Sequence, residues 1–165
     1  MSFLIHHKKY FLSILLLCSF VFTNAQTSVP IFDFAQYENR VQQKNDTLYI
    51  VNFWATWCKP CVVELPIFEK ASQSFATQPV KIILISQDAK TRATQVNDFL
   101  KKNNYTSESF ILSAGNPNIW IDKIDKNWSG TIPMTLFYKN GNEIYFHEGD
   151  YASYEDLEKI IHSKL

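Results

Sequence analysis

Two cysteines separated by two residues, Cys58 and Cys61, are the side chains whose type and spacing point most directly to chemistry. A Cys-x-x-Cys pair between a strand and a helix is typical of a redox site, because the free N–H groups at a helix N-terminus stabilise a thiolate. Lys59 adds a cation, and Pro60 suits a first helical turn, where it stiffens the loop. We therefore expect a reversible disulfide in which Cys58 attacks a client and Cys61 resolves the adduct.

Two simpler interpretations of the pair stay open. A zinc site needs about four ligands, and the other candidates here, His147 and His162, do not have the spacing of a zinc finger. The pair could also be inert and buried. We expect neither, and we expect no metal ion and no cofactor.

Glu64 follows Cys61 by three residues, so the two side chains can share one face of a helix. A carboxyl there could adjust the thiol pKa values and take the proton when Cys61 attacks. The alternative is a solvated surface glutamate.

The surrounding elements follow from hydrophobic patterning. Residues 48–54 and 80–86 are nearly continuous apolar runs, which indicate strands buried on both faces. Helices are expected at residues 32–44, with Asp33 as N-cap, at 58–77, with a kink at Pro66, and at 91–103. This alternation is typical of parallel strands joined by crossover helices.

The second half of the chain has a different pattern. A short strand is expected at 110–112, a helix at 118–128, a hairpin of 134–139 and 143–148 around Asn140-Gly141, and a last helix at 153–165. The sequence therefore predicts an α/β fold, with a central mixed β-sheet and helices on both faces.

Three segments resemble a known family. They are Val51-Asn52-Phe53-Trp54-Ala55-Thr56-Trp57-Cys58-Lys59-Pro60-Cys61, then Glu64-Leu65-Pro66, then Gly130-Thr131-Ile132-Pro133. In these segments the chain is similar to the thioredoxin superfamily and, within it, to the exported TlpA/ResA-like thiol-disulfide oxidoreductases. The order of strands and helices agrees with that resemblance over about residues 33–165.

The resemblance implies a thioredoxin fold with Pro133 in cis against the cysteine pair, and an Ile132 backbone that pairs with an extended substrate; an ordinary trans proline is the alternative. Trp57, Lys59 and Pro60 are expected beside the substrate. The buried aspartate of thioredoxin is replaced by Asn52, which leaves Glu64 as the matching acid of TlpA/ResA-like proteins.

The same resemblance implies an enzyme that reduces disulfides of exported client proteins, apocytochrome c among them, with electrons from a membrane-embedded donor. The sequence leaves the direction of electron flow open. A peroxiredoxin is one rival, although Ala55 and Val51 stand where that class has threonine and proline. A thioredoxin-fold binding module without redox turnover is the other.

Length and charge add limits. The 165 residues suit one domain, and 16 basic against 16 acidic side chains give no electrostatic case for nucleic acid. Residues 1–25 are basic, then apolar, then small, which predicts a secretory signal peptide cleaved after Ala25; an uncleaved membrane anchor is the alternative. We thus expect a thioredoxin-like domain at 26–165 in an exported, periplasmic protein.

Overall fold

A computed structural model describes residues 28–165, so the expected signal peptide at 1–25 lies outside the described residues. Within that part of the chain a mixed sheet has the strand order β1-β4-β3-β2-β5-β6. The first four strands in this order pair in parallel, and β5 and β6 add antiparallel partners beside β2. The strands are β1 (Ile31–Phe32), β2 (Leu48–Trp54), β3 (Val80–Ser86), β4 (Glu108–Leu112), β5 (Met134–Lys139) and β6 (Asn142–Glu148).

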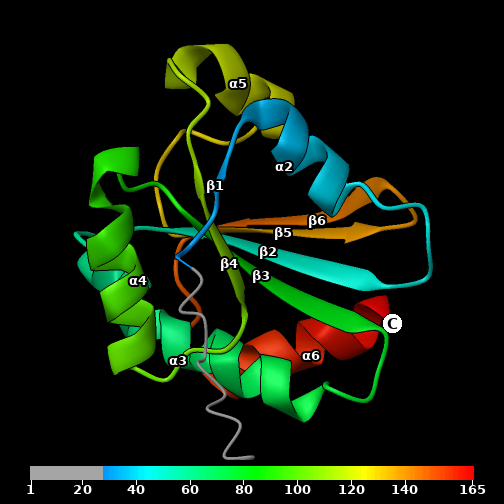
Figure 1. Ribbon diagram of the computed structural model, residues 1–165. Coiled ribbons are helices and arrows are strands. Elements are labelled where there is room, and N and C mark those ends of the chain that lie inside the picture. The colour runs from blue at the N-terminus through cyan, green and yellow to red at the C-terminus, as the bar shows by residue number, and fades with distance from the viewer. Residues whose placement is uncertain (1–27) are drawn as a thin grey trace, which may run out of the picture.

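Five α-helices cover the two faces of the sheet within the described residues (Figure 1). Helices α2 (Phe34–Val41) and α5 (Pro117–Ile124) pack on one face, where aromatic side chains fill the core. Helices α3 (Lys59–Ser74), α4 (Ala93–Lys102, after the 3₁₀ turn η1, Lys90–Arg92) and α6 (Tyr154–Lys164) lie on the other face. The prediction of a mixed sheet with helices on both sides is confirmed.

The central strands are those the sequence predicts. Every residue of β2 is buried, since β3 and β5 flank it and helices cover both faces. Its even-numbered side chains face α3, and its odd-numbered side chains face α2. Strand β2 ends at Trp54, and the chain turns there into the loop that carries the cysteines. The loop that carries the cysteines therefore leaves from a fully buried central strand.

Three elements differ from the sequence prediction. The helix expected at 32–44 is shorter and spans Phe34–Val41. Residues 31 and 32 form β1 beside β4, a strand too short for an alternating pattern to reveal. The helix expected at 118–128 ends at Ile124, because Asp125 has an extended backbone and its Oδ1 accepts the Asn127 N–H, which competes with helical hydrogen bonding.

Two tight turns shape the second half. Asn140 and Gly141 both have positive φ, of 51° and 77°, as a two-residue hairpin between β5 and β6 requires. The Ile132–Pro133 peptide bond is cis, which confirms the prediction, and the Pro133 carbonyl accepts a 2.9 Å hydrogen bond from the Gly149 N–H. None of the helices in residues 28–165 is long and apolar enough to span a bilayer.

Candidate active site

The junction between β2 and α3 places Cys58 at the N-terminus of a 16-residue helix. Cys58 is the N-cap, and its sulfur accepts the Cys61 N–H at 3.3 Å. Pro60 occupies the first turn, where its missing N–H leaves no gap in the helical hydrogen bonds. The helix N-terminus that the sequence predicts for Cys58 is thus present, with its orphan N–H groups and positive dipole end directed at the sulfur.

Cys58 and Cys61 are joined by a disulfide. Cys61 is fully buried, whereas Cys58 keeps 6% of its surface exposed, so any partner outside the protein meets Cys58 first. This asymmetry supports the assignment of Cys58 as the attacking sulfur and Cys61 as the resolving one.

The cis-proline loop lies against the disulfide. Cys58 Sγ is 3.7 Å from the Ile132 carbonyl oxygen, although the two residues are 74 positions apart in the sequence. Pro133 is buried and Ile132 is half-buried, so the backbone ahead of the proline borders the sulfur. The sequence prediction that segments 58–61 and 132–133 meet is confirmed.

Exposed side chains surround the sulfur of Cys58. Trp57 is 61% exposed, and Lys59 and Pro60 are exposed beside it. Val63, which the sequence did not single out, is 68% exposed one turn further along α3. Large apolar side chains usually lie inside a protein, so an exposed tryptophan and valine next to a redox sulfur form a surface suited to contact with another chain.

Asp88, also absent from the sequence-based site, holds the loop ahead of the cysteines. Its carboxylate accepts the Thr56 N–H at 2.8 Å and the Thr56 hydroxyl at 2.7 Å. A third hydrogen bond comes from Ser86 Oγ at 2.9 Å. Asp88 itself is 1% exposed. The available signal was its position, just past the end of a buried parallel strand, where polar residues reach the same sheet edge as the loop after β2.

Glu64 on α3 is buried, with 1% of its surface exposed. The alternative of a solvated surface glutamate is therefore wrong. Asn52 Nδ2 donates to Glu64 Oε1 at 2.8 Å, and the Tyr151 N–H donates to Oε2 at 3.0 Å. Burial raises the pKa of Glu64 to about 7, because these two hydrogen bonds only partly offset the loss of water. A carboxyl with this pKa can both take and release a proton near neutral pH.

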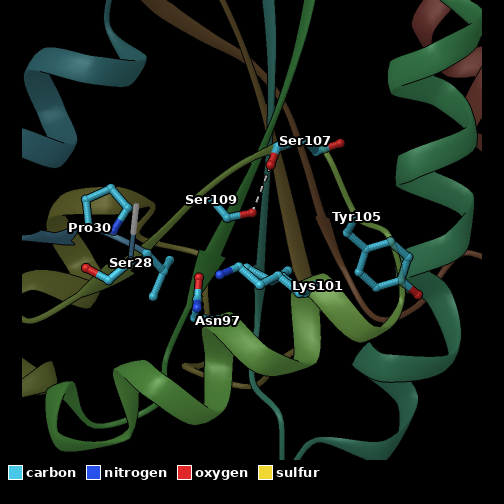
Figure 2. A pocket seen from close by; sticks show the side chains of 9 residues that line it. Ser28, Pro30, Asn97, Lys101, Tyr105, Ser107 and Ser109 are labelled. Carbon is cyan, nitrogen blue, oxygen red and sulfur yellow. Dashed lines mark hydrogen bonds between the residues drawn. The ribbon is translucent and has the colours of Figure 1, made fainter. Parts of the chain in front are cut away.

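Within the part of the chain that the structure describes, neither a cluster of metal ligands nor the cavity beside α4 forms part of this site. Over residues 28–165, no three His, Cys, Asp or Glu side chains gather closely enough to hold a metal ion. A cavity of about 240 Å³ opens between α4, β4 and residues 28–30, and its lining includes Asn97, Lys101 and Tyr105 (Figure 2). Neither cysteine nor Glu64 lines it.

Comparison with known proteins agrees with this geometry. The thiol-disulfide oxidoreductase ResA of Oceanobacillus iheyensis is 31% identical over 131 residues, which cover 71% of this chain and 60% of that protein. The sporulation thiol-disulfide oxidoreductase A of Bacillus subtilis is 31% identical over 67 residues, or 40% of this chain and 41% of that protein. The matched segments thus span less than two thirds of these relatives.

Solved structures show the same fold. A thioredoxin-related protein from Neisseria meningitidis serogroup B superposes with a TM-score of 0.62 at 22% identity, covering 75% of this chain and 89% of that one. The AhpC/TSA family matches residues 25–139, well over half of the sequence. The chain, which has a thioredoxin fold and relatives that are thiol-disulfide oxidoreductases, therefore belongs to the AhpC/TSA family.

Proposed function

We propose that this protein is a thiol-disulfide oxidoreductase that reduces disulfides of client proteins through Cys58 and Cys61. The observation that carries the proposal is a disulfide closed at the N-terminus of α3, directly against a cis-proline loop. This arrangement leaves Cys58 slightly exposed, at 6% of its surface, and buries Cys61 completely. The names of the matched oxidoreductases support the same activity.

The reduced pair would act in two steps. The Cys58 thiolate attacks one sulfur of a client disulfide, forms a mixed disulfide and releases the other client sulfur as a thiolate, which takes a proton from solvent. Cys61 then loses its proton and attacks the Cys58 sulfur, which closes the protein's own disulfide and releases the second client thiol. The client gains two electrons and the cysteine pair loses two.

Each step has a group suited to it. The α3 N-terminus and Lys59 favour the Cys58 thiolate in the first step. In the second step the proton of Cys61 has no route to water at the sulfur, since Cys61 is fully buried. Glu64 is the proposed acceptor, because it shares the helix face of Cys61 and its pKa of about 7 leaves it partly ionised at neutral pH.

Client binding would use the surface around Cys58. An extended client segment can pair with the Ile132 backbone, as an added strand does, while Trp57 and the adjoining Lys59 and Pro60 contact its side chains. The Ile132 carbonyl oxygen, 3.7 Å from Cys58 Sγ, places such a segment beside the reacting sulfur.

Trapping tests the activity and the assignment of the two sulfurs. Cys61→Ser should accumulate mixed disulfides with clients, visible as slower bands on non-reducing gels that disappear with dithiothreitol. Cys58→Ser, the matched control, should form none. The opposite pattern would reverse the assignment, and adducts with neither variant would refute disulfide exchange. Peroxide consumption by the reduced wild type, measured alongside, tests the peroxidase alternative.

We further propose that the protein works as a reductant outside the cytoplasm, after a signal peptide at residues 1–25 directs its export. Lys-Pro between the cysteines resembles thioredoxin-like reductants, and Glu64 opposes thiolate stabilisation by Lys59 and the helix. The potential should therefore lie nearer about −270 mV than the roughly −120 mV of a strong oxidant. Redox titration against dithiothreitol decides this, and a value near the oxidant end would reverse the direction.

The proposed partners follow from that direction. An exported reductant needs a membrane-embedded electron donor to stay reduced, and its clients would be exported proteins with unwanted disulfides, apocytochrome c among them. Mass spectrometry of the adducts trapped by Cys61→Ser would identify the clients. Adducts containing only cytoplasmic proteins would contradict the proposed location.

A further inference from the structure

A row of polar side chains crosses the sheet beneath Glu64. Asn52 on β2 pairs with Thr135 on β5, and Thr135 pairs with His147 on β6, so the three side chains lie side by side on one face. It is the face covered by α3, because the neighbours of this row along the strands pack in the same core as the cysteines. Asn52 Nδ2 joins the row to Glu64 Oε1 at 2.8 Å and to Thr135 Oγ1 at 3.2 Å.

Tyr151 closes the row from the loop between β6 and α6. Its N–H donates to Glu64 Oε2, and its ring lies against the imidazole of His147, with the ring centroids 4.5 Å apart. Tyr151 is 5% exposed, whereas His147 is half-buried at the sheet edge. The row therefore runs from the buried carboxyl beside Cys61 to a histidine that reaches the surface.

Two buried polar atoms of this group, Asn52 Oδ1 and His147 Nε2, have no hydrogen-bond partner within residues 28–165. The buried Tyr151 hydroxyl makes no hydrogen bond of normal geometry there, although the side chains of Thr135 and Tyr145 lie close to it. Buried polar atoms are almost always hydrogen-bonded, either to protein or to ordered water. The Tyr37 hydroxyl in the opposite core, by contrast, meets the Tyr138 hydroxyl at 3.0 Å. Such atoms offer hydrogen-bonding positions for water between Glu64 and His147.

We propose that His147 is the proton-relay residue that connects Glu64 to solvent, through water held by Tyr151 and the Asn52–Thr135 row. The inference rests on the proposed function, because it supplies the exit for the proton that Glu64 takes from Cys61. Imidazole suits this task, since one ring nitrogen can accept a proton while the other releases one. Its Nε2 atom is buried, although the residue as a whole is half-buried.

The proton balance of the step is complete. Cys61 gives its proton to the Glu64 carboxylate, and the resulting thiolate attacks Cys58 Sγ. The Cys58–Cys61 disulfide forms, the bond between Cys58 and the client breaks, and the client sulfur leaves as a thiolate that takes a proton from solvent. Glu64 passes the proton through water to His147 Nε2, and His147 releases a proton to bulk solvent. Glu64 is then ionised again. No oxidant or reductant beyond the client disulfide takes part.

Other charged and titratable groups near His147 must be considered in any pH measurement. Glu64 on α3, Tyr145 on β6, and Tyr151 and Asp150 in the following loop surround the row. Lys164 on α6 lies over the Tyr145 ring, 5.5 Å from its centroid. Glu148 points elsewhere, since it binds the Ser129 and Thr131 hydroxyls.

The test measures resolution separately from attack. A labelled client thiol is loaded on Cys58, and its release is followed in stopped flow from pH 5 to 9. His147→Phe keeps an aromatic ring against Tyr151 but cannot carry a proton, and should slow release about tenfold at neutral pH, less than the roughly 100-fold loss typical of removing an acid–base group itself. The rate of the first attack and the reduction potential should be unchanged. His162→Phe, on α6, is the matched control.

His147→Ala adds a readout that a packing role would not move. Its release should also be slow, and added imidazole should restore it toward the wild-type rate by entering the space left by the ring. Wild-type rates in His147→Phe, or slow release in His147→Ala that imidazole does not restore, would overturn the relay.

Failure of the proposed function would show separately, because wild type would then release no client thiol. In that event a crystal structure of the protein tests whether water connects His147 to Tyr151. Ordered water bridging His147 Nε2 and the Tyr151 hydroxyl is expected, and a dry contact between the two rings overturns the relay.

Discussion

Two carboxyl groups on the same helix, Glu64 near the start of α3 and Glu69 further along, are buried to nearly the same extent but have different surroundings. Their exposed fractions are 1% and 6%. Glu69 accepts four hydrogen bonds, from the backbone N–H and the hydroxyl of both Thr106 and Ser107. Glu64 accepts only two, from Asn52 and the Tyr151 N–H.

The number of donors decides the charge state. Burial raises the pKa of Glu69, but its four hydrogen bonds outweigh burial and hold that pKa below the usual value. At Glu64 burial prevails and the pKa rises to about 7. A fully satisfied buried carboxylate is a structural connection, here between α3 and the loop before β4. A half-satisfied one remains able to exchange a proton.

The same substitution at both positions should separate these roles in stability. Glu69→Gln places an amide N–H₂ against a backbone N–H that has no other acceptor, and should lower the free energy of unfolding by about 3 kcal/mol. Glu64→Gln should lower it by less than about 1 kcal/mol, because Asn52 can turn its amide and accept instead. Urea unfolding of the oxidised proteins measures both. Equal losses would mean that the donor count does not distinguish the two sites.

The pH dependence of stability should have opposite signs at the two carboxyls. The folded-state pKa of Glu64 is raised, so its contribution to stability is present below about pH 4.5 and is lost as pH rises through about 7, by roughly 3 kcal/mol. Glu69 titrates lower, so its contribution is present above about pH 4.5 and is lost in acid.

Unfolding curves between pH 3 and 8 check these signs. Glu64→Gln should flatten the decline toward neutral pH, and Glu69→Gln should flatten the acid side. Glu143 titrates in the same direction as Glu64, with its pKa raised by burial to about 8, so the difference between variant and wild type is the quantity to compare. An unchanged neutral-side slope in Glu64→Gln would contradict the raised pKa.

Redox kinetics should respond to only one of the two residues. Glu64→Gln should slow resolution by Cys61 about 100-fold, equivalent to about 2.7 kcal/mol, and should lower the midpoint of thiol titration because a nearby negative charge is removed. Glu69→Gln should resolve at the wild-type rate at temperatures where it is folded. Thiol titration and release of a labelled client measure both effects. A normal rate in Glu64→Gln would reduce Glu64 to a packing role.

The smallest effect should come from removing one of the two hydrogen-bond donors to Glu64, which changes the pKa of this carboxyl. Asn52→Leu keeps the volume but removes the hydrogen bond to Oε1, which should move the Glu64 pKa above about 7. Carbon NMR of the labelled carboxyl reads this pKa directly. A downward movement would show that Asn52 destabilises the ionised form.

The sequence was sufficient for the cysteines and for the strand and helix that position them, because apolar runs and the helix-start signals act locally. The cis-proline loop against the cysteines was expected only from the resemblance to a known family, since no local pattern encodes that contact. It placed Glu64 on the right helix face but could not establish its burial, which depends on Tyr151, 87 positions away. His147 gave no signal within its own strand. Its position in one row with Asn52 and Thr135 depends on the register of β2, β5 and β6, which no short stretch of sequence encodes.

The two outer strands of the sheet, β1 and β6, also affect the tendency of the protein to aggregate. An open strand edge is a template on which other chains can aggregate, and short strands, charges and bulges all weaken it. Here β1 offers two residues, while β6 carries the charge of Glu148 and its pairing with β5 is irregular between Phe137 and Tyr138. Both borders of the sheet are thereby weakened as templates for the addition of a strand from another chain.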